Sequence, residues 1–428
     1  MMPNIRFFLI CLALAPLLHG QGLSPDEQQI RETAQSVSAD ALKFLEKVVN
    51  INSGTLNLKG VRKVGKAYNR KFKGIGFDTR WVDMPPEMQR AGHLIATRSG
   101  NRGKKLLLVG HLDTVFEKRS PFQKFTRQGD TAFGPGVNDM HGGNVIFLYA
   151  LITLHRLGHL DGVTIAAVLH GDEEKVGRPH EISRLDIREI ARNSDAALAY
   201  EAQISGTGTI ARRGSSNWFL EVTGRRAHSS GIFSKESGAG AIFEASRILS
   251  AFYDEVRGEE FLSFNPGSIV GGTDVAYNVN TTSGEAFGKT NVIAQKVVVD
   301  GGLRFITEEQ KENARDKMRE IVSRSLPVTS ATITFEDRYP AMPPRPENYA
   351  LLEVFSRVSQ DLGYGVREPF DPGKRGAGDI AFVAELVPAL DGLGVVGSGG
   401  HTPQESVNIP EIAKAIEMSA LLIYRLTR

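Results

Sequence analysis

The sequence predicts an α/β protein in which a domain built on a mixed or parallel sheet is interrupted by a smaller α+β domain. Three observations support this fold class. Short apolar runs alternate with amphipathic helical segments up to about residue 200. Near residue 212 the pattern changes to an order of strand, helix, strand, strand, helix, strand. Helical periodicity then returns near residue 349, which indicates that the chain re-enters the first domain.

The first part of the chain, residues 21–212, supplies helices and strands in alternation. Ser24 is a possible cap for a helix over residues 26–50, in which Ile30 and Ala34 begin a series at steps of three and four. Residues 106–110 form an unbroken apolar run, typical of a strand buried on both faces of a parallel sheet. The other elements expected here are helices over 61–72, 144–157 and 182–193, and strands over 77–82, 94–98, 163–169 and 196–200.

Residues 213–336 are predicted to form the inserted domain. Its size and its order of elements suit an independent small α+β unit. The proline-rich stretch 340–346 suits a linker back to the first domain, which residues 337–428 complete with a helix over 349–362. The inserted domain is expected to contain strands over 218–222, 268–270, 292–299 and 331–335, and helices over 240–252 and 308–325.

Composition limits the possible partners and the location of the protein. The chain has 428 residues and a net charge of +2, which gives no indication of a nucleic acid or another polyanionic partner. Residues 1–20 are predicted to be a signal peptide, because about a dozen apolar residues follow Arg6 and are too few to span a bilayer. A short membrane anchor is the alternative. Since Cys11 lies in this segment, we expect an exported protein, periplasmic or secreted, without disulfides and without membrane attachment after signal removal.

The apolar run 106–110 leads directly into His111, Leu112 and Asp113. Open α/β sheets place their ligand sites at such carboxyl ends of strands. In an extended chain His111 and Asp113 point to the same side. An imidazole that binds a metal commonly has a carboxylate partner that fixes its tautomer, so the pair is a candidate metal ligand with its support. A surface turn after the strand is the alternative.

Further acids and a second histidine follow at the ends of other predicted elements. Asp139 lies in GPGVNDMHGGN before a helix, where a helix cap is the alternative role. Glu173 and Glu174 follow the strand over 163–169, where a solvated acidic loop is the alternative. Two imidazoles and three carboxylates suit a pair of divalent ions, zinc in preference, with manganese or cobalt as substitutes. The five candidate ligands are His111, Asp139, Glu174, Glu201 and His401.

In this order and spacing the chain resembles the M20 family of metallopeptidases, close to its carboxypeptidase G2 (glutamate carboxypeptidase) branch. The matching segments are HxD, an aspartate before MHGG, a Glu-Glu pair, a later acid and GHTPQE, and they cover most of the chain. The resemblance implies a catalytic α/β domain interrupted by a ferredoxin-like lid that dimerises, and therefore a homodimer. Many relatives have aspartate at the position of Glu201; either side chain supplies a carboxylate.

The resemblance also implies roles for individual residues. Asp139 would bridge two zinc ions, with His111 and Glu201 completing one site and Glu174 and His401 the other. Glu173 would be the general base, and Asp113 would orient His111.

The resemblance implies functions for residues of the inserted domain and the last part of the chain. His228, in TGRRAHSS, would stabilise the oxyanion in the site of the partner subunit, with a surface loop as the alternative. Arg304 would grip a free substrate carboxylate, with a structural ion pair as the alternative, and Asn291 would add an amide contact. The backbone at Gly376 and Gly378 would line the pocket, with a plain turn as the alternative, and Asp379 would cap a helix beginning at Ile380. Nearby Lys374 and Arg375 are either solvated or favour an acidic side chain such as glutamate.

These expectations combine into a dizinc hydrolase that cleaves an amide or peptide bond next to a free carboxylate. Its substrate would be a small peptide or an N-acyl amino acid. An N-acyl amino acid deacylase or a dipeptidase on the same scaffold is the nearest alternative, and a binding protein without catalysis is a more distant one. A zinc phosphoesterase is disfavoured, because no further basic cluster flanks the ligands in the sequence.

Overall fold

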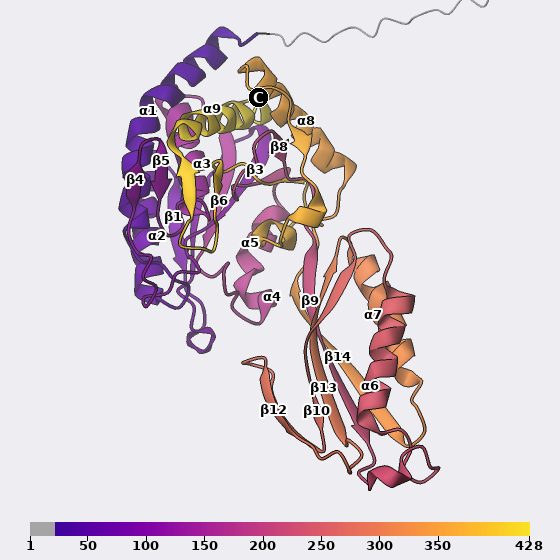
Figure 1. Ribbon diagram of the computed structural model, residues 1–428. Coiled ribbons are helices and arrows are strands. Elements are labelled where there is room, and N and C mark those ends of the chain that lie inside the picture. The colour runs from indigo at the N-terminus through magenta and orange to yellow at the C-terminus, as the bar shows by residue number, and fades with distance from the viewer. Residues whose placement is uncertain (1–21) are drawn as a thin grey trace, which may run out of the picture.

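The computed structural model describes residues 22–428, so the predicted signal peptide and Cys11 lie outside the described residues. The structure confirms the α/β class with a mixed sheet. Figure 1 shows a larger sheet surrounded by helices in one part of the molecule and a second sheet with α6 and α7 beside it in the other. Among residues 22–428 we find no helix that has both the length and the apolarity needed to cross a membrane.

The larger sheet has six strands in the order β1-β2-β6-β3-β7-β16. The strands β6, β3, β7 and β16 run parallel, whereas β2 is antiparallel to β6 and β1 is antiparallel to β2. The carboxyl ends of the four parallel strands therefore lie at the same edge of the sheet. The strands are β1 (Asp78–Val82), β2 (His93–Arg98), β3 (Arg102–His111), β6 (Val163–His170), β7 (Ala196–Ala199) and β16 (Ala389–Leu390).

The strand β3 is buried on both faces, as its apolar run predicted. Leu106 and Leu108 belong to the core that also contains α1, α2, α3 and α9, whereas Leu107 and Val109 belong to the core on the opposite face with α5. The contacts among α1, α3 and α9 make them one packed layer. The helices of this domain are α1 (Pro25–Val49), α2 (Leu58–Gly74), α3 (His141–Arg156), α4 (His180–Ser183), α5 (Leu185–Ala191), α8 (Pro346–Asp361) and α9 (Ile409–Leu426).

The helix expected over 182–193 is in fact two short helices that meet at Arg184. This residue leaves the helical conformation, with φ −119° and ψ 13°. Its side chain is fully buried and bonded to two aspartates, so tertiary contacts override the local helical pattern.

The second sheet has the order β10-β13-β9-β14 and is antiparallel throughout, which is the ferredoxin-like arrangement. Its apolar core is separate from those of the larger sheet. The hairpin β11–β12 between β10 and β13 was not expected from the sequence. Its elements are β9 (Gly214–Gly224), α6 (Gly240–Ala251), β10 (Ser263–Gly272), β11 (Asp274–Asn278), β12 (Ser283–Phe287), β13 (Lys296–Phe305), α7 (Glu308–Ser323) and β14 (Thr329–Tyr339).

Several shorter elements complete the chain. A small sheet in the order β17-β18-β5-β4 lies near the segment that carries His401, and β8 pairs with β15. These strands have two or three residues each, too few for an apolar pattern to predict. They are β4 (Thr126–Gln128), β5 (Thr131–Phe133), β8 (Thr207–Gly208), β15 (Glu368–Pro369), β17 (Gly397–Ser398) and β18 (Ser406–Asn408). The short helical turns are η1 (Pro86–Met88), η2 (Ser229–Gly231), η3 (Phe252–Val256), η4 (Pro372–Lys374) and η5 (Asp379–Phe382).

Candidate metal centre

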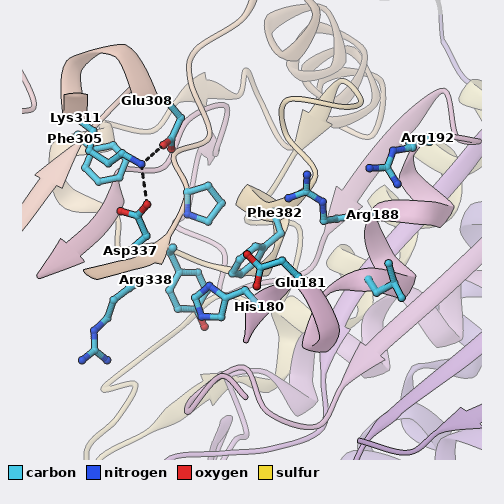
Figure 2. A pocket seen from close by; sticks show the side chains of 13 residues that line it. His180, Glu181, Arg188, Arg192, Phe305, Glu308, Lys311, Asp337, Arg338 and Phe382 are labelled. Carbon is cyan, nitrogen blue, oxygen red and sulfur yellow. Dashed lines mark hydrogen bonds and ion pairs between the residues drawn. The ribbon is translucent and has the colours of Figure 1, made fainter. Parts of the chain in front are cut away.

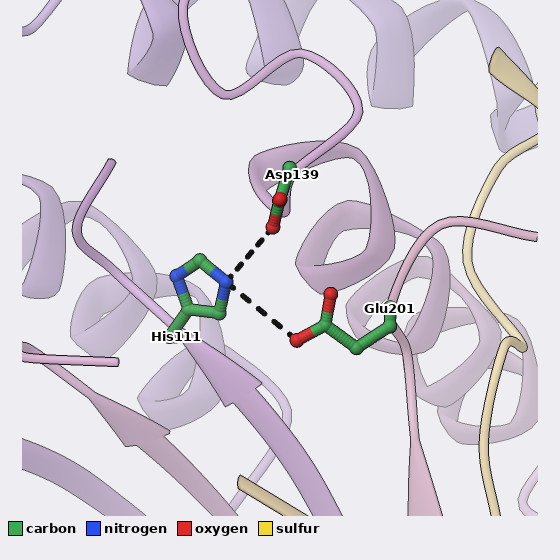
Figure 3. Close-up of side chains that lie close together, drawn as sticks. All are labelled: His111, Asp139 and Glu201. Carbon is green, nitrogen blue, oxygen red and sulfur yellow. Dashed lines mark hydrogen bonds and ion pairs between the residues drawn. The ribbon is translucent and has the colours of Figure 1, made fainter. Parts of the chain in front are cut away.

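Asp139 lies between the two candidate histidine ligands. Its Oδ1 is 3.1 Å from Nε2 of His111, and its Oδ2 is 3.0 Å from Nε2 of His401. Glu201 approaches the first imidazole, with Oε1 at 3.7 Å, and Glu174 approaches the second, with Oε2 at 3.2 Å. Figure 3 shows the first group, in which Asp139 and Glu201 converge on one nitrogen of His111. The five predicted ligands thus form two adjacent groups that share Asp139.

The parallel strands explain why residues distant in sequence meet here. His111 ends β3, Glu174 follows β6 and Glu201 follows β7, so all three lie at the same edge of the sheet. Asp139 precedes α3, whose first turn lies directly against the segment before Glu201. A Cβ at Gly143 would lie 1.7 Å from the carbonyl oxygen of Tyr200, so this approach requires glycine.

His401 reaches the centre from the loop between β17 and β18. Its φ of 64° is in the left-handed region, which is uncommon for a residue other than glycine. Backbone strain of this kind costs about 1–3 kcal/mol and is typically retained where a side chain must be aimed at a site.

Buried carboxylates fix the backbone around the centre. Asp113 accepts hydrogen bonds from the N–H groups of Glu173 and Glu174 at 3.0 and 3.1 Å, and its Oδ1 is 3.4 Å from Nδ1 of His111. Glu405, which sequence reasoning did not assign to the site, accepts from the N–H groups of Gly136, Asn138 and Asp139. The only signal for Glu405 was its place in the segment GHTPQE. Asp113 and Glu405 therefore orient the two loops that carry the acids.

The electrostatics of the centre call for added positive charge. Burial raises the pKa of Glu173 well above its ordinary value and raises that of Glu201 to about 7, where nearby Asp139 adds to the effect. Hydrogen bonds that the His401 ring donates to Asp139 and Glu174 raise its pKa to about 11. In residues 22–428 no lysine or arginine forms an ion pair with these carboxylates; only the two histidines do. A set of imidazole nitrogens and carboxylate oxygens, without a lysine or arginine in the described residues to compensate the negative charge, fits two divalent cations.

A cavity of about 630 Å³ opens beside this centre. Glu173, Glu174 and His401 line it from the larger domain, and Arg304, Arg338 and Tyr339 line it from the second sheet. Glu173 lies close to His111 and forms with it and Glu174 a third group of possible ligands, but in residues 22–428 it forms no ion pair with either candidate histidine. Its carboxyl group is therefore placed beside the candidate ions and faces the space available to a substrate.

The predicted substrate residues are only partly in this cavity. Arg304 and the backbone at Gly376 line it, and in the described chain Arg304 forms no ion pair with a carboxylate, which argues against the purely structural alternative. Gly378 is packed against the guanidinium of Arg212 instead. His228 and Asn291 are exposed, in the segments after β9 and before β13, and do not line the cavity; Nδ1 of His228 is 2.8 Å from the hydroxyl of Ser230.

The expected capping role of Asp379 is wrong. Gly378 occupies the position before the short helix η5, and no side chain caps it. The carboxylate of Asp379 instead lies 2.5 Å from Nδ1 of His170 and accepts from Nε of Arg184 at 2.9 Å. Arg184 also donates to Asp172 at 2.7 Å, so a buried charged network lies behind the Glu173–Glu174 segment.

Basic residues that do not flank the ligands in the sequence gather beside the candidate metal centre in the structure. Arg213 and Arg338 lie close enough to Arg304 that, together with burial, they lower its pKa. A second cavity of about 240 Å³ shares Arg304 and Gly376 with the first and is also lined by Arg213, Lys374 and Arg375. These cations come from four separate segments. Arg304, Lys374 and Arg375 were singled out in the sequence, but no local pattern indicated that Arg213 and Arg338 lie beside them.

The chain is similar to known proteins in both sequence and fold. Residues 107–425 match the family described as Peptidase family M20/M25/M40. Carboxypeptidase G2 from Pseudomonas sp. is 27% identical, over 99% of this chain and 98% of that protein. A succinyl-diaminopimelate desuccinylase from Gluconacetobacter diazotrophicus is 24% identical, over 83% and 89%. Among solved structures, the aminopeptidase PepT from Bacillus cereus has a TM-score of 0.73 at 18% identity, covering 91% of this chain and 99% of that one. An M20 family metallo-carboxypeptidase from Sulfolobus solfataricus has a TM-score of 0.65 at 15% identity, covering 90% and 98%.

Proposed function

The chain belongs to peptidase family M20/M25/M40 and is a metal-dependent hydrolase, and from this premise we propose that it uses two zinc ions to cleave an amide bond next to a free carboxylate. The observation that carries the proposal is the position of Asp139 between two histidines, with Glu173 next to His111 and, in residues 22–428, in no ion pair with either histidine. His111 and Glu201 would hold one ion and Glu174 and His401 the other, with Asp139 shared between them.

The chain supplies proton transfer and orientation. A bound pair of divalent ions polarises the carbonyl of the scissile amide and lowers the pKa of the attacking water. Glu173 takes a proton from that water and passes it to the departing nitrogen, which is the work of a general base followed by a general acid. Asp113 keeps both glutamates in register by accepting hydrogen bonds from their N–H groups.

The cations of the cavity support a substrate with a free carboxylate. Arg304 presents a guanidinium without a carboxylate partner in the described chain, and a guanidinium binds carboxylates in a two-pronged geometry. The adjoining cavity with Arg213, Lys374 and Arg375 favours a second carboxylate, such as the side chain of glutamate.

We also propose that the enzyme works as a homodimer. His228 and Asn291 are exposed and lie outside the cavity of their own chain, which suits a role in the site of a second copy. Ile242 and Phe243 on α6 and Ile269 on the edge strand β10 are about half exposed, as expected for a surface that a partner covers. We also propose that the inserted domain spans residues 213–336. We further propose that the protein is exported after removal of residues 1–20.

The experiment that tests the function compares Glu173→Gln with the parent enzyme, both loaded with zinc. The substrates are N-acyl amino acids, acyl-glutamates and dipeptides. We expect the variant to keep its bound zinc and to lose about 10²–10⁴-fold in kcat, the usual contribution of a general base. Glu189→Gln, which changes an exposed acid on α5, is the matched control. Near-normal turnover by Glu173→Gln, or a parent enzyme that is indifferent to chelators, would refute the proposal.

A further inference from the structure

A β-bulge at the end of β14 directs two side chains of the second sheet toward the candidate metal centre. The pairing of β14 with β9 shifts between Asp337 and Tyr339, so Arg338 is the extra residue in the ladder. Bulges re-aim side chains and often lie next to active sites. Here both Arg338 and Tyr339 line the cavity that contains Glu173.

Tyr339 makes a direct contact with the segment that carries the proposed base. Its hydroxyl donates a hydrogen bond of 2.6 Å to the backbone carbonyl oxygen of Glu173. In the described part of the chain no other donor reaches that oxygen. Burial, with a contribution from the Glu173 carboxylate, raises the pKa of Tyr339 well above its ordinary value, so the phenol stays protonated and remains a donor.

The ring of Tyr339 is held by a partner of its own. Its centroid is 5.2 Å from that of Phe382, and Phe382 in turn contacts the guanidinium of Arg184 at 5.3 Å and the ring of His180 at 5.4 Å. Figure 2 shows Phe382 and His180 side by side where the second sheet faces α4 and α5, around a further cavity of about 380 Å³ that Tyr339 also lines. Tyr339 lines both cavities and, together with the ion pair between Arg178 and Glu336, bridges the two parts of the molecule at this point.

The backbone of Glu173 is therefore fixed on both sides of its Cα atom. Its N–H donates to Asp113, which also lies near His111, and its C=O accepts from Tyr339 of the second sheet. The position of the Glu173 carboxyl group depends on both contacts, because no helix or strand holds this residue.

We propose that Tyr339 is a positioning residue, whose hydroxyl holds the general base in register with the second sheet. The inference rests on the proposed function of Glu173. Asp113 sets the distance from the base to the metal ligands, and Tyr339 sets it relative to the surface that carries Arg304. The base and the carboxylate grip are thereby kept in one geometry although they belong to different sheets.

The experiment is a double-mutant cycle between Tyr339→Phe and Glu173→Gln on the full zinc-loaded enzyme. Tyr339→Phe keeps the ring against Phe382 and removes only the hydroxyl. We expect kcat to fall about 10-fold with KM changed less than about twofold, because a displaced base is misaligned without loss of substrate contacts. In the Glu173→Gln background, where there is no base to position, the same change should lower the residual rate less than about twofold.

Controls separate positioning from loss of structure. Tyr364→Phe removes a phenol hydroxyl that donates to Glu417 at 2.7 Å. Neither residue lines the cavity beside the candidate metal centre, so the substitution should leave kcat within about twofold. Phe382→Leu loosens the ring contact and keeps the hydroxyl. It should lower the unfolding temperature, and its kcat should fall less than that of Tyr339→Phe. Zinc content should be the same in every variant.

Three results would overturn the inference: kcat of Tyr339→Phe within twofold of the parent, an equal loss in both backgrounds, or loss of zinc from Tyr339→Phe. The first two leave the proposed function intact if Glu173→Gln is inactive. Full activity of Glu173→Gln would instead refute the proposed function and remove the premise of this inference with it.

Discussion

Substitution of Arg304 by alanine should reveal whether the cavity holds a free carboxylate. Arg304 lies on β13, opposite Ser215 of β9 and Ser263 of β10, and in the described chain no carboxylate competes for its guanidinium. Burial and the nearby Arg213 and Arg338 all disfavour the positive charge on Arg304. An anion bound here would therefore relieve the repulsion among these guanidinium groups as well as form hydrogen bonds. A charge-assisted hydrogen bond contributes about 1.5–3 kcal/mol. The expected loss in kcat/KM is therefore about 10- to 150-fold.

The assay compares two substrates that differ only at the carboxylate. One is an N-acyl amino acid with a free carboxylate and the other is its primary amide. The predicted loss applies to the first substrate, whereas kcat/KM for the amide should change less than about threefold, because no anion is present to lose the contact. Arg304→Lys keeps the charge but not the two-pronged geometry, so its loss should be intermediate. Arg319→Ala, on the exposed face of α7, is the control.

Equal losses on the acid and the amide would refute this reasoning. Such a result would mean that Arg304 shapes the cavity rather than binding the carboxylate. A loss confined to the acid but restored fully by lysine would show that charge alone is sufficient and that the guanidinium geometry is not needed.

Two further predictions concern stability. Arg184→Met should lower the free energy of unfolding by about 3–5 kcal/mol in urea titrations, because it leaves Asp172 and Asp379 buried without their shared cation; a loss below about 1 kcal/mol would contradict it. In the metal-free protein, burial raises the pKa of Glu201 and Glu405 from 4.5 to about 7. The folded state then holds protons that the unfolded state releases, so the contribution of these two groups to stability should fall as pH rises from about 4.5 to 7, by up to about 3 kcal/mol per group. The buried His93 and His141, whose pKa values are lowered to about 4 and about 3, act in the opposite direction over this window. The measurement is therefore the difference in unfolding free energy between the parent and Glu405→Gln, with chelator; a difference that does not fall as pH rises would contradict the prediction.

The ligands of the candidate centre could be predicted because each follows a recognisable element. His111, Glu174 and Glu201 come directly after buried apolar strands, and parallel strands bring such positions to one edge whatever their distance in the chain. Predicting these ligands did not require the order of the strands in the sheet, which the sequence pattern does not reveal. Asp139 and His401 lie in glycine-rich loops; their residue types made them candidate ligands, and their place in the family motif supported the assignment.

Residues whose roles depend on a distant partner could not be predicted in this way. Asp379 was expected to cap a helix, since an acid before an apolar run has that local use. Its actual partners, His170 and Arg184, are 209 and 195 residues away in the chain. Arg184 itself was placed inside a regular helix for the same reason. A local pattern cannot show that a buried charge will be neutralised by a residue from another segment.

The distribution of charge also shows why the small net charge was a poor guide to the substrate. Four carboxylates, those of Asp139, Glu173, Glu174 and Glu201, gather at the centre, while the cations gather on the neighbouring walls of the cavity. An anionic substrate bound to Arg304 would be repelled by the acids unless cations neutralise them. Two divalent ions carry as much positive charge as four carboxylates carry negative charge. On the proposed function, metal binding and the binding of an anionic substrate are therefore coupled, and by linkage each would strengthen the other.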